Sequence, residues 1–365
     1  MSHMENPLAT PDQLFQRRSL GSLPIDLQDI IFFATQCLTQ AAGLLLQLPQ
    51  SVTAQANVLL ARYWLVEPMM SHEFSDVSAA ILYLTAKLSP HPRSPRDISN
   101  VYAYLTSPSS SLFHHPSAAP PPPIPNPQDS SSSTHYLSES TYQAFHTRLL
   151  ALEARVLYAL GFDTHVALPY SLAVTYLQAL DFLLLRAGGG GDNTNTTEKG
   201  KTKAENPQKA SKNALAHLTL TYLTTALLSP QHLYLTSPPS SLATAAIYNA
   251  ARDLGAKMPA CEWWEVFDVD REELGFLVVG MRSVEGWGRR MRGDMEGMMM
   301  RGGGGRGRGV LRRGDVEGEL GRRGIRVVSA VPEGEGGGGG GGGEGGDLEE
   351  EMARRMDEKM AGLEG

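Results

Sequence analysis

The stretch Phe74–Leu88, read FSDVSAAILYLTAKL, constrains the fold of this chain more than any other part of the sequence. Between Val77 and Ala86 it has no charged residue, and it combines small side chains with large ones. An α-helix that is apolar on every side is buried on every side, and small residues let neighbouring helices approach closely. Lys87 follows where such a helix would reach solvent. The sequence therefore predicts a central helix surrounded by other helices, with a cation at its end.

Apolar residues at helical spacing continue on both sides of this stretch, and Pro, Gly and Ser separate the segments. They form two groups of five predicted helices. The first group covers 25–46, 51–67, 74–88, 94–105 and 138–162, and the second covers 169–186, 214–228, 240–255, 261–267 and 271–291. No strand pattern competes, so we expect the ordered part to be all-α.

The two groups resemble an internal repeat. The tripeptide 79–81 aligns with the identical tripeptide 245–247, and in both groups this small-residue helix is the third of five. The same offset places Asp253 where the first group has Lys87. Matching order and matching position together favour two related helical domains.

Four segments have compositions that do not support a packed core. The segment 1–22 is polar, 107–137 contains a Ser run and consecutive prolines, and 187–210 is rich in Gly, Asn and Thr. The segment 292–365 is rich in Gly, Arg and Glu, and its patch 347–360 could form a short charged helix. We expect a flexible N-terminus, two flexible inserts and a low-complexity tail, which leaves 23–165 and 166–291 as two folded domains.

Charge and cysteine content disfavour several classes of protein. A formal net charge of −7 argues against a general nucleic-acid-binding protein. Cys37 and Cys261 are the two cysteines, too few for a disulfide framework or a zinc site. No apolar run reaches the length of a membrane span, and the N-terminus does not look like a signal peptide. We therefore expect a soluble protein of a reducing, intracellular compartment.

Motifs for catalysis and cofactor binding are missing from the sequence. It has no GxxxxGK[ST] loop, no GxGxxG between a strand and a helix, and no HExxH or Cys/His grouping. Asp268, Asp270, Glu272 and Glu273 are better explained as the acidic start of a helix than as a metal site. We expect no enzymatic activity, no catalytic residue, no cofactor, no metal ion and no small-molecule substrate.

Two charged residues stand out from their surroundings. Glu153 lies on the apolar stripe of its predicted helix, next to Leu149, Val156 and Leu157. A carboxylate in that position needs a cation or hydrogen-bond donors, and Lys87 is the candidate. Alternatively, Glu153 reaches solvent at the edge of its helix, and Lys87 is a solvated cation favoured by the helix dipole.

Several stretches, in the right order along the chain, resemble the cyclin family and, within it, the cyclin L group. They are 37–64, 72–88, 94–105, 152–180 and 240–259. The resemblance implies two tandem five-helix cyclin boxes, 23–165 and 166–291. It also implies a nuclear regulatory subunit that binds and activates a cyclin-dependent protein kinase of the type that serves RNA polymerase II transcription and mRNA splicing.

In this family, a lysine at the end of the third helix and a glutamate in the fifth contact the kinase. The matching residues here are Lys87 and Glu153, so the resemblance favours a functional role for the pair. Asp253 replaces the lysine in the second box, which suits a kinase engaged mainly by the first box. After the lysine the family usually has an acidic pair, where this chain has Leu88-Ser89-Pro90.

Two other functions stay open at this point. General transcription factors similar to TFIIB share the cyclin-box fold and bind DNA, although they carry a zinc ribbon and a basic face that this chain lacks. Arg301, Arg306 and Arg308 lie among glycines, as in RGG segments, which would allow weak contact with RNA. Ser-Pro pairs, such as those at Ser94 and Ser107, suit either proline-directed phosphorylation or helix-start and turn chemistry.

Overall fold

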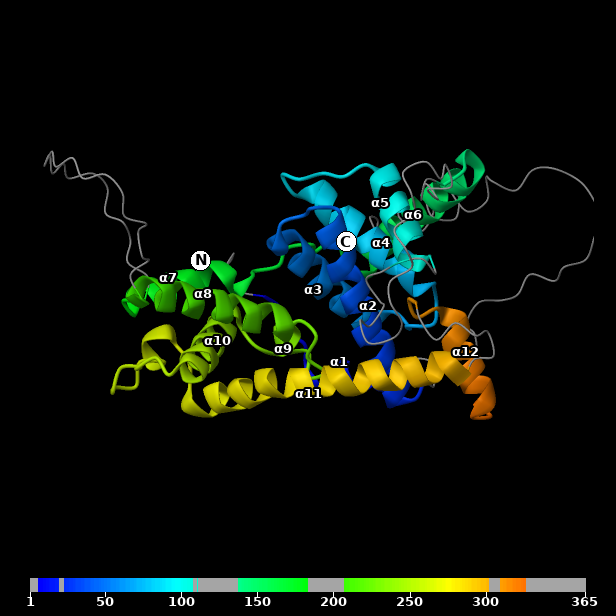
Figure 1. Ribbon diagram of the computed structural model, residues 1–365. Helices are drawn as coiled ribbons and strands as arrows, with labels where there is room; N and C mark the ends of the chain where they lie inside the picture. Colours follow the sequence, from blue (N-terminus) through cyan, green and yellow to red (C-terminus); the bar gives the residue numbers. More distant parts are fainter. Residues whose placement is uncertain are drawn as a thin grey trace, which may run out of the picture. The chain divides into compact units, whose positions relative to one another are not determined.

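The computed structural model describes residues 6–19, 23–107, 110, 137–182, 207–301 and 309–325. Regular secondary structure within these ranges is entirely helical (Figure 1), which confirms the all-α prediction. The described residues all belong to one compact unit, Met1–Ser329. Most of the two predicted inserts, and the predicted helix at 347–360, lie outside the described residues.

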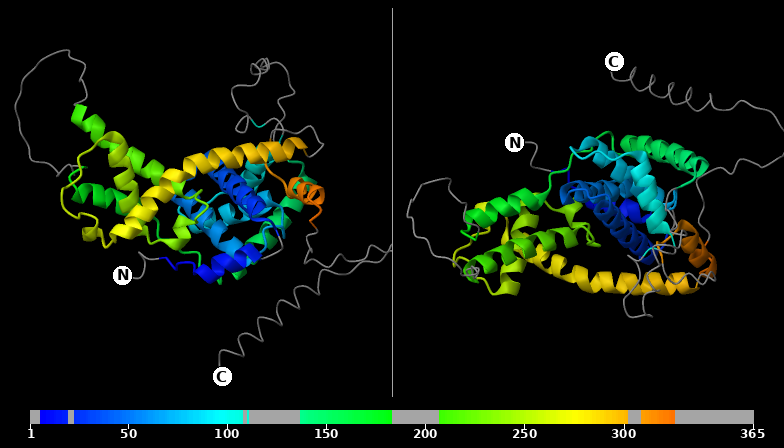
Figure 2. Two further views of the ribbon diagram at one scale, coloured as in Figure 1. Left: turned by 90° about the horizontal axis from the view of Figure 1, so that it is seen from below. Right: turned by 45° about the horizontal axis from the view of Figure 1, so that its top comes forward.

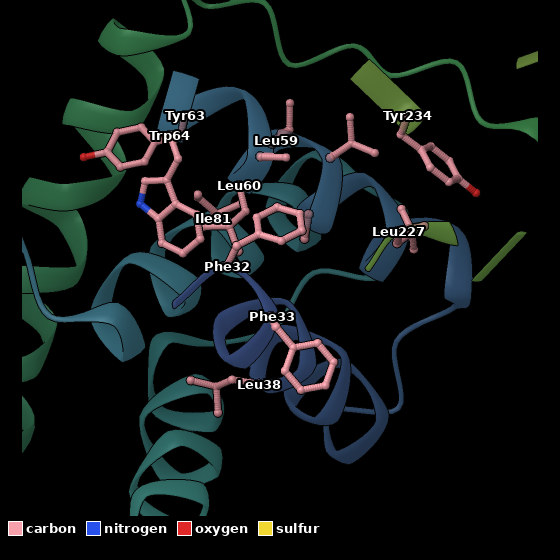
Figure 3. Close-up of a cluster of buried hydrophobic side chains, with 14 of the residues drawn as sticks. Phe32, Phe33, Leu38, Leu59, Leu60, Tyr63, Trp64, Ile81, Leu227 and Tyr234 are labelled. Atoms are coloured by element: carbon pink, nitrogen blue, oxygen red, sulfur yellow. The ribbon is translucent and has the colours of Figure 1, made fainter. Parts of the chain in front are cut away.

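The first group of helices is built around the stretch that was predicted to be central. It comprises α2 (Ile25–Leu45), α3 (Gln50–Val66), α4 (Phe74–Leu88), α5 (Pro95–Thr106) and α6 (Glu139–Ala159). Helix α4 packs against the other four. Ala79, Ala80 and Ile81 are completely buried, and Figure 3 shows Ile81 among Phe32, Leu60 and other apolar side chains. Each large aliphatic side chain buried in this way stabilises the fold by about 1.5–3 kcal/mol.

Local sequence explains where two of these five helices begin. Ser94 accepts a hydrogen bond from the backbone of Asp97 and the Asp97 carboxylate accepts one in return, which makes a capping box before Pro95. Ser138 caps α6 by accepting from the Thr141 backbone. Helix α3 differs from the prediction, because it begins at Gln50, directly after Pro49, without a side-chain cap.

The second group contains α7 (Pro169–Ala179), α8 (Pro207–Ala226), α9 (Leu233–Thr236), α10 (Pro239–Leu254) and α11 (Arg271–Arg301). Helix α10 packs against α7, α8 and α11, and its small-residue segment is completely buried. The predicted helix 169–186 ends at Ala179, and the one predicted at 261–267 is a single 3-10 turn, Glu265–Phe267. The short α9 was not predicted.

Apolar contacts connect the two groups. Phe33 of α2 meets Trp287 of α11 edge to face at 5.5 Å between ring centroids, and Phe32 meets His232 in the same way at 4.5 Å. The N-terminal segment, predicted to be loose, contains α1 (Pro11–Ser19), which packs against α3. Thr10 and Gln13 cap α1 reciprocally, so a short polar sequence forms a helix there.

The C-terminal side of the second group differs most from the prediction. Helix α11 continues past residue 291 to Arg301 and, as Figure 2 shows, runs along both groups of helices. Residues 309–325, here called the C-terminal strap, contain α12 (Arg313–Arg322). Leu311, Val316 and Leu320 of the strap are buried, and the backbone N–H of Arg313 donates to Glu73 Oε1 at 3.2 Å. Part of the predicted low-complexity tail is therefore folded, because these three apolar residues are buried against the rest of the molecule.

Candidate functional site

The structure joins the two charged residues that the sequence singled out. Lys87 lies in the last turn of α4, and Glu153 lies on the side of α6 that packs against α4. Lys87 Nζ donates a hydrogen bond to Glu153 Oε1 at 3.0 Å. The pairing suggested by the apolar stripe is therefore present, and the alternative of two separately solvated charges does not describe this structure. A role in kinase contact stays a prediction.

The two partners are unequally exposed. The Glu153 side chain is 6% exposed, whereas the Lys87 side chain is 55% exposed. The hydrogen bond from Lys87 to Glu153, and then the negative charge of that carboxylate, raise the pKa of Lys87. A buried anion thus holds a half-exposed cation, and an ammonium group has two donors besides the one that Glu153 accepts.

Aromatic and apolar side chains lie next to this pair. The Lys87 ammonium stands 5.7 Å from the centre of the Tyr83 ring, at the outer limit of a cation–π contact. Leu88, directly after the lysine, is exposed, and so is Leu150, one helical turn before Glu153. Both leucines could therefore lose exposure to water if another protein bound at this end of α4.

Further ion pairs place α6 relative to α4 and α3. Arg148 Nε lies 3.0 Å from Asp76 Oδ2 in the first turn of α4, and Arg155 Nη2 lies 3.0 Å from Glu67 Oε2 just after α3. Partly exposed pairs of this kind contribute roughly 0–1 kcal/mol each, so they fix the register of α6 more than they stabilise the fold. Sequence reasoning missed both, although the two arginines flank Glu153 on the same helix.

The corresponding place in the second group is arranged differently. Asp253 near the end of α10 accepts hydrogen bonds from the Tyr222 hydroxyl and, at 2.8 Å, from Arg282 Nη1. The hydrogen bond from Tyr222 is the main cause of the lowered pKa of Asp253, and Arg282 adds to it. Both donors come from the second group itself, and the carboxylate here is 30% exposed, in contrast to the buried Glu153.

The remaining sequence expectations concern metals, membranes and nucleic acid. Within the described ranges, no three His, Cys, Asp or Glu side chains come together in a way that could hold a metal ion. A search of the same residues finds no helix that is long and apolar enough to cross a membrane. Arg301 is exposed at the end of α11, while Arg306 and Arg308 lie outside the described residues.

Comparison with curated proteins places this fold among named relatives. An uncharacterized cyclin-L1-like protein of Schizosaccharomyces pombe is 29% identical over 238 residues, which is 65% of this chain and 76% of that protein. Human cyclin-L2 is 28% identical over 273 residues, covering 74% of this chain and 43% of cyclin-L2. Human cyclin-L1 is 28% identical over 238 residues, covering 65% of this chain and 36% of cyclin-L1. The chain thus matches less than half the length of either human protein, and no family model matches it.

A solved structure supports the same architecture. A chain in the crystal structure of the yeast RNA Pol II CTD kinase CTDK-1 complex superposes with a TM-score of 0.54, covering 76% of this chain and 72% of that one. At 14% identity this likeness shows the fold alone. Together with the sequence matches, it confirms the predicted resemblance: the chain is a relative of the cyclins, and the relatives that it matches in sequence are cyclin L proteins.

Proposed function

We propose that this chain is a cyclin-like regulatory subunit that binds a cyclin-dependent protein kinase and favours its active conformation. The observation that carries the proposal is the Lys87–Glu153 pair, a half-exposed cation held by a buried carboxylate at the end of the central helix. The match to proteins named cyclin-L1 and cyclin-L2 supports a nuclear kinase of the transcription and RNA-processing type. The proposal includes both residues as kinase contacts.

The geometry suggests how the contact would work. Glu153 takes one hydrogen bond from the Lys87 ammonium, so the remaining donors are free to meet carbonyl or carboxylate oxygens of a partner. Because the carboxylate holds the long lysine side chain in one place before binding, less conformational entropy is lost on association. Leu88 and Leu150 would lose their exposure to water in the same contact.

Binding energy at this site would act on the kinase rather than on a substrate. An active protein kinase needs an internal Lys–Glu ion pair, and that pair forms when one mobile helix near the active site is in position. A regulatory subunit that binds the kinase more tightly when this helix is in its active position shifts the kinase population towards the active conformation. In this proposal the kinase supplies all the catalytic groups.

The test is affinity capture with the full chain from nuclear extract, followed by identification of the bound kinase and measurement of its activity. We expect the wild-type chain to recover an active cyclin-dependent kinase, and Lys87→Ala and Glu153→Ala to recover much less. Lys257→Ala is a matched control, because Lys257 is an exposed cation of the second group. Failure of the wild-type chain to bind any such kinase would overturn the proposal, and full activation by both variants would remove the two residues from it.

A further inference from the structure

Ser-Pro dipeptides in the described residues differ sharply in how accessible the serine is. Ser229 and Ser237 are 0% and 5% exposed, so neither can enter another enzyme's active site without unfolding. Ser94 is exposed, but the residues that follow it are the first turn of α5, which its hydroxyl caps by accepting from the Asp97 backbone at 3.1 Å, so a modifying kinase could bind them in extended form only after that turn had opened. Among the Ser-Pro pairs of which both residues are described, Ser89-Pro90 remains as the one whose serine is neither fully buried nor part of a helix N-terminal cap; Pro108, which follows Ser107, lies outside the described residues.

The surroundings of Ser89 suit a modifying enzyme. Helix α4 ends at Leu88, and Ser89 has an extended backbone with φ −94° and ψ 168°. The next residues, 90–92, are exposed and non-helical. The Ser89 hydroxyl donates to the carbonyl oxygen of Ala86 at 2.8 Å and accepts from the backbone N–H of His91 at 3.0 Å. The residues that follow the serine are thus exposed and outside any helix, so a protein kinase can reach them without unfolding a helix.

We propose that Ser89 is a phosphorylation site for a proline-directed Ser/Thr kinase, and that phosphate at this position weakens the Lys87–Glu153 contact site. In the reaction the Ser89 oxygen forms a bond to the γ-phosphorus of ATP while the bond from that phosphorus to ADP breaks. The hydroxyl proton leaves with the base of the modifying kinase. The effect on the contact site rests on the proposed function, whereas the modification itself does not.

The position of Ser89 makes a phosphate act on Lys87. The α-carbons of residues 87 and 89 are at most about 7.6 Å apart, since consecutive α-carbons are separated by 3.8 Å. A phosphoserine carries a charge of about −1.5 to −2 at neutral pH, so it competes with Glu153 for the lysine ammonium. Arg93, the next cation along the chain, is already engaged with the carbonyl oxygens of Leu46 and Gln47. Lys87 is therefore the nearby cation that can respond.

Phosphorylation would also loosen the end of α4. A phosphorylated Ser89 has no hydroxyl proton, so the hydrogen bond to Ala86 is lost. In addition, the C-terminal end of a helix is the negative end of its dipole, and a phosphate there is repelled. Both effects move Lys87 away from the geometry that Glu153 imposes.

The first experiment tests the modification. The full chain is incubated with ATP and a recombinant mitogen-activated protein kinase, which is proline-directed, and the phosphorylated residues are mapped by mass spectrometry. We expect phosphate on Ser89 in the folded chain, and on Ser229 and Ser237 only after unfolding in urea. Phosphate on Ser89 in the unfolded chain but not in the folded one would overturn the proposal.

The second experiment tests the consequence. The treated wild-type chain and the identically treated Ser89→Ala variant are compared in the nuclear-extract capture assay. We expect phosphorylation to lower the amount of captured kinase by about fivefold or more, the lower end of typical coupling between two sites, and Ser89→Ala to be unaffected by treatment. Equal capture by phosphorylated and unphosphorylated wild type would refute the coupling. If even the untreated wild type captures no kinase, the proposed function fails, while the mapping result still decides the modification.

Discussion

Replacing Lys87 and replacing Glu153 are expected to change the free energy of unfolding by different amounts. Lys87→Met keeps most of the aliphatic side chain but leaves the buried Glu153 carboxylate without its cation. Breaking a fully buried pair costs about 3–5 kcal/mol, and an exposed pair contributes about 0–1 kcal/mol. Because Glu153 is 6% exposed and Lys87 is 55% exposed, we expect an intermediate loss of ~1–3 kcal/mol in the free energy of unfolding.

Glu153→Leu is expected to behave differently. It removes the buried charge, fills the site with an apolar side chain among Leu149, Leu152 and Val156, and leaves Lys87 as a solvated surface cation. Replacing a buried charge by a hydrophobic residue is often neutral or stabilising, so we expect a change of less than about 1 kcal/mol. Kinase capture should nevertheless fall, because Lys87 has lost the group that holds it. This variant therefore separates a contribution to binding from a contribution to folding.

The assay is urea unfolding at neutral pH followed by the helical circular-dichroism signal, with kinase capture measured on the same preparations. Arg289→Met is the matched control, since Arg289 pairs with Glu285 on an exposed face of α11 and should contribute less than about 0.5 kcal/mol. The reasoning is refuted if Glu153→Leu destabilises the chain more than Lys87→Met does. It is also refuted if Glu153→Leu captures the kinase as well as the wild type.

Three further predictions concern the strap, the pKa of Lys87 and the two cysteines. A chain ending at residue 308 should unfold at a lower urea concentration than one ending at 325, because it lacks the strap, and Leu320→Ala alone should cost about 2–5 kcal/mol. The hydrogen bond with Glu153 raises the pKa of Lys87 above 10.5, so its stabilisation is complete below that pH and is lost as the pH rises through the raised value. The difference in melting temperature between wild type and Lys87→Met should therefore shrink in alkaline buffer, and a constant difference would contradict this. Burial raises the pKa of Cys37 to about 12, whereas Cys261 is exposed, so a thiol reagent should modify Cys261 faster than the partly exposed Cys37.

Sequence reasoning succeeded where local chemistry and burial agree. The bounds of α4 were predicted correctly because a run without charges can only be buried, and Lys87 marks the return to solvent. The start of α5 was predicted because Ser94 and Pro95 favour a helix start through their own geometry. The partner of Glu153 could be suggested because an uncompensated carboxylate on an apolar stripe is costly.

Sequence reasoning failed where a segment is helical only because the rest of the molecule supports it. The strap is rich in Gly and Arg, so its average hydrophobicity is low. It nevertheless contains Leu311, Val316 and Leu320, which are buried against other parts of the molecule. The same applies to the end of α11, where Met298 and Met299 are buried. Isolated helices as short as α12 are marginal in water, so tertiary packing decides whether they form.

A helix that is buried on all sides can meet partners only at its ends, and the two ends of α4 are used differently. At the first end, Glu73 accepts from the backbone of Arg313 in the strap, and burial raises the pKa of Glu73. That end is therefore occupied by the chain itself. At the second end, Lys87 is held by Glu153 yet remains half exposed, and Ser89 follows it in an extended segment. A partner that recognises α4 through Lys87 approaches this second end, so contact and modification are expected to converge on residues 87–89.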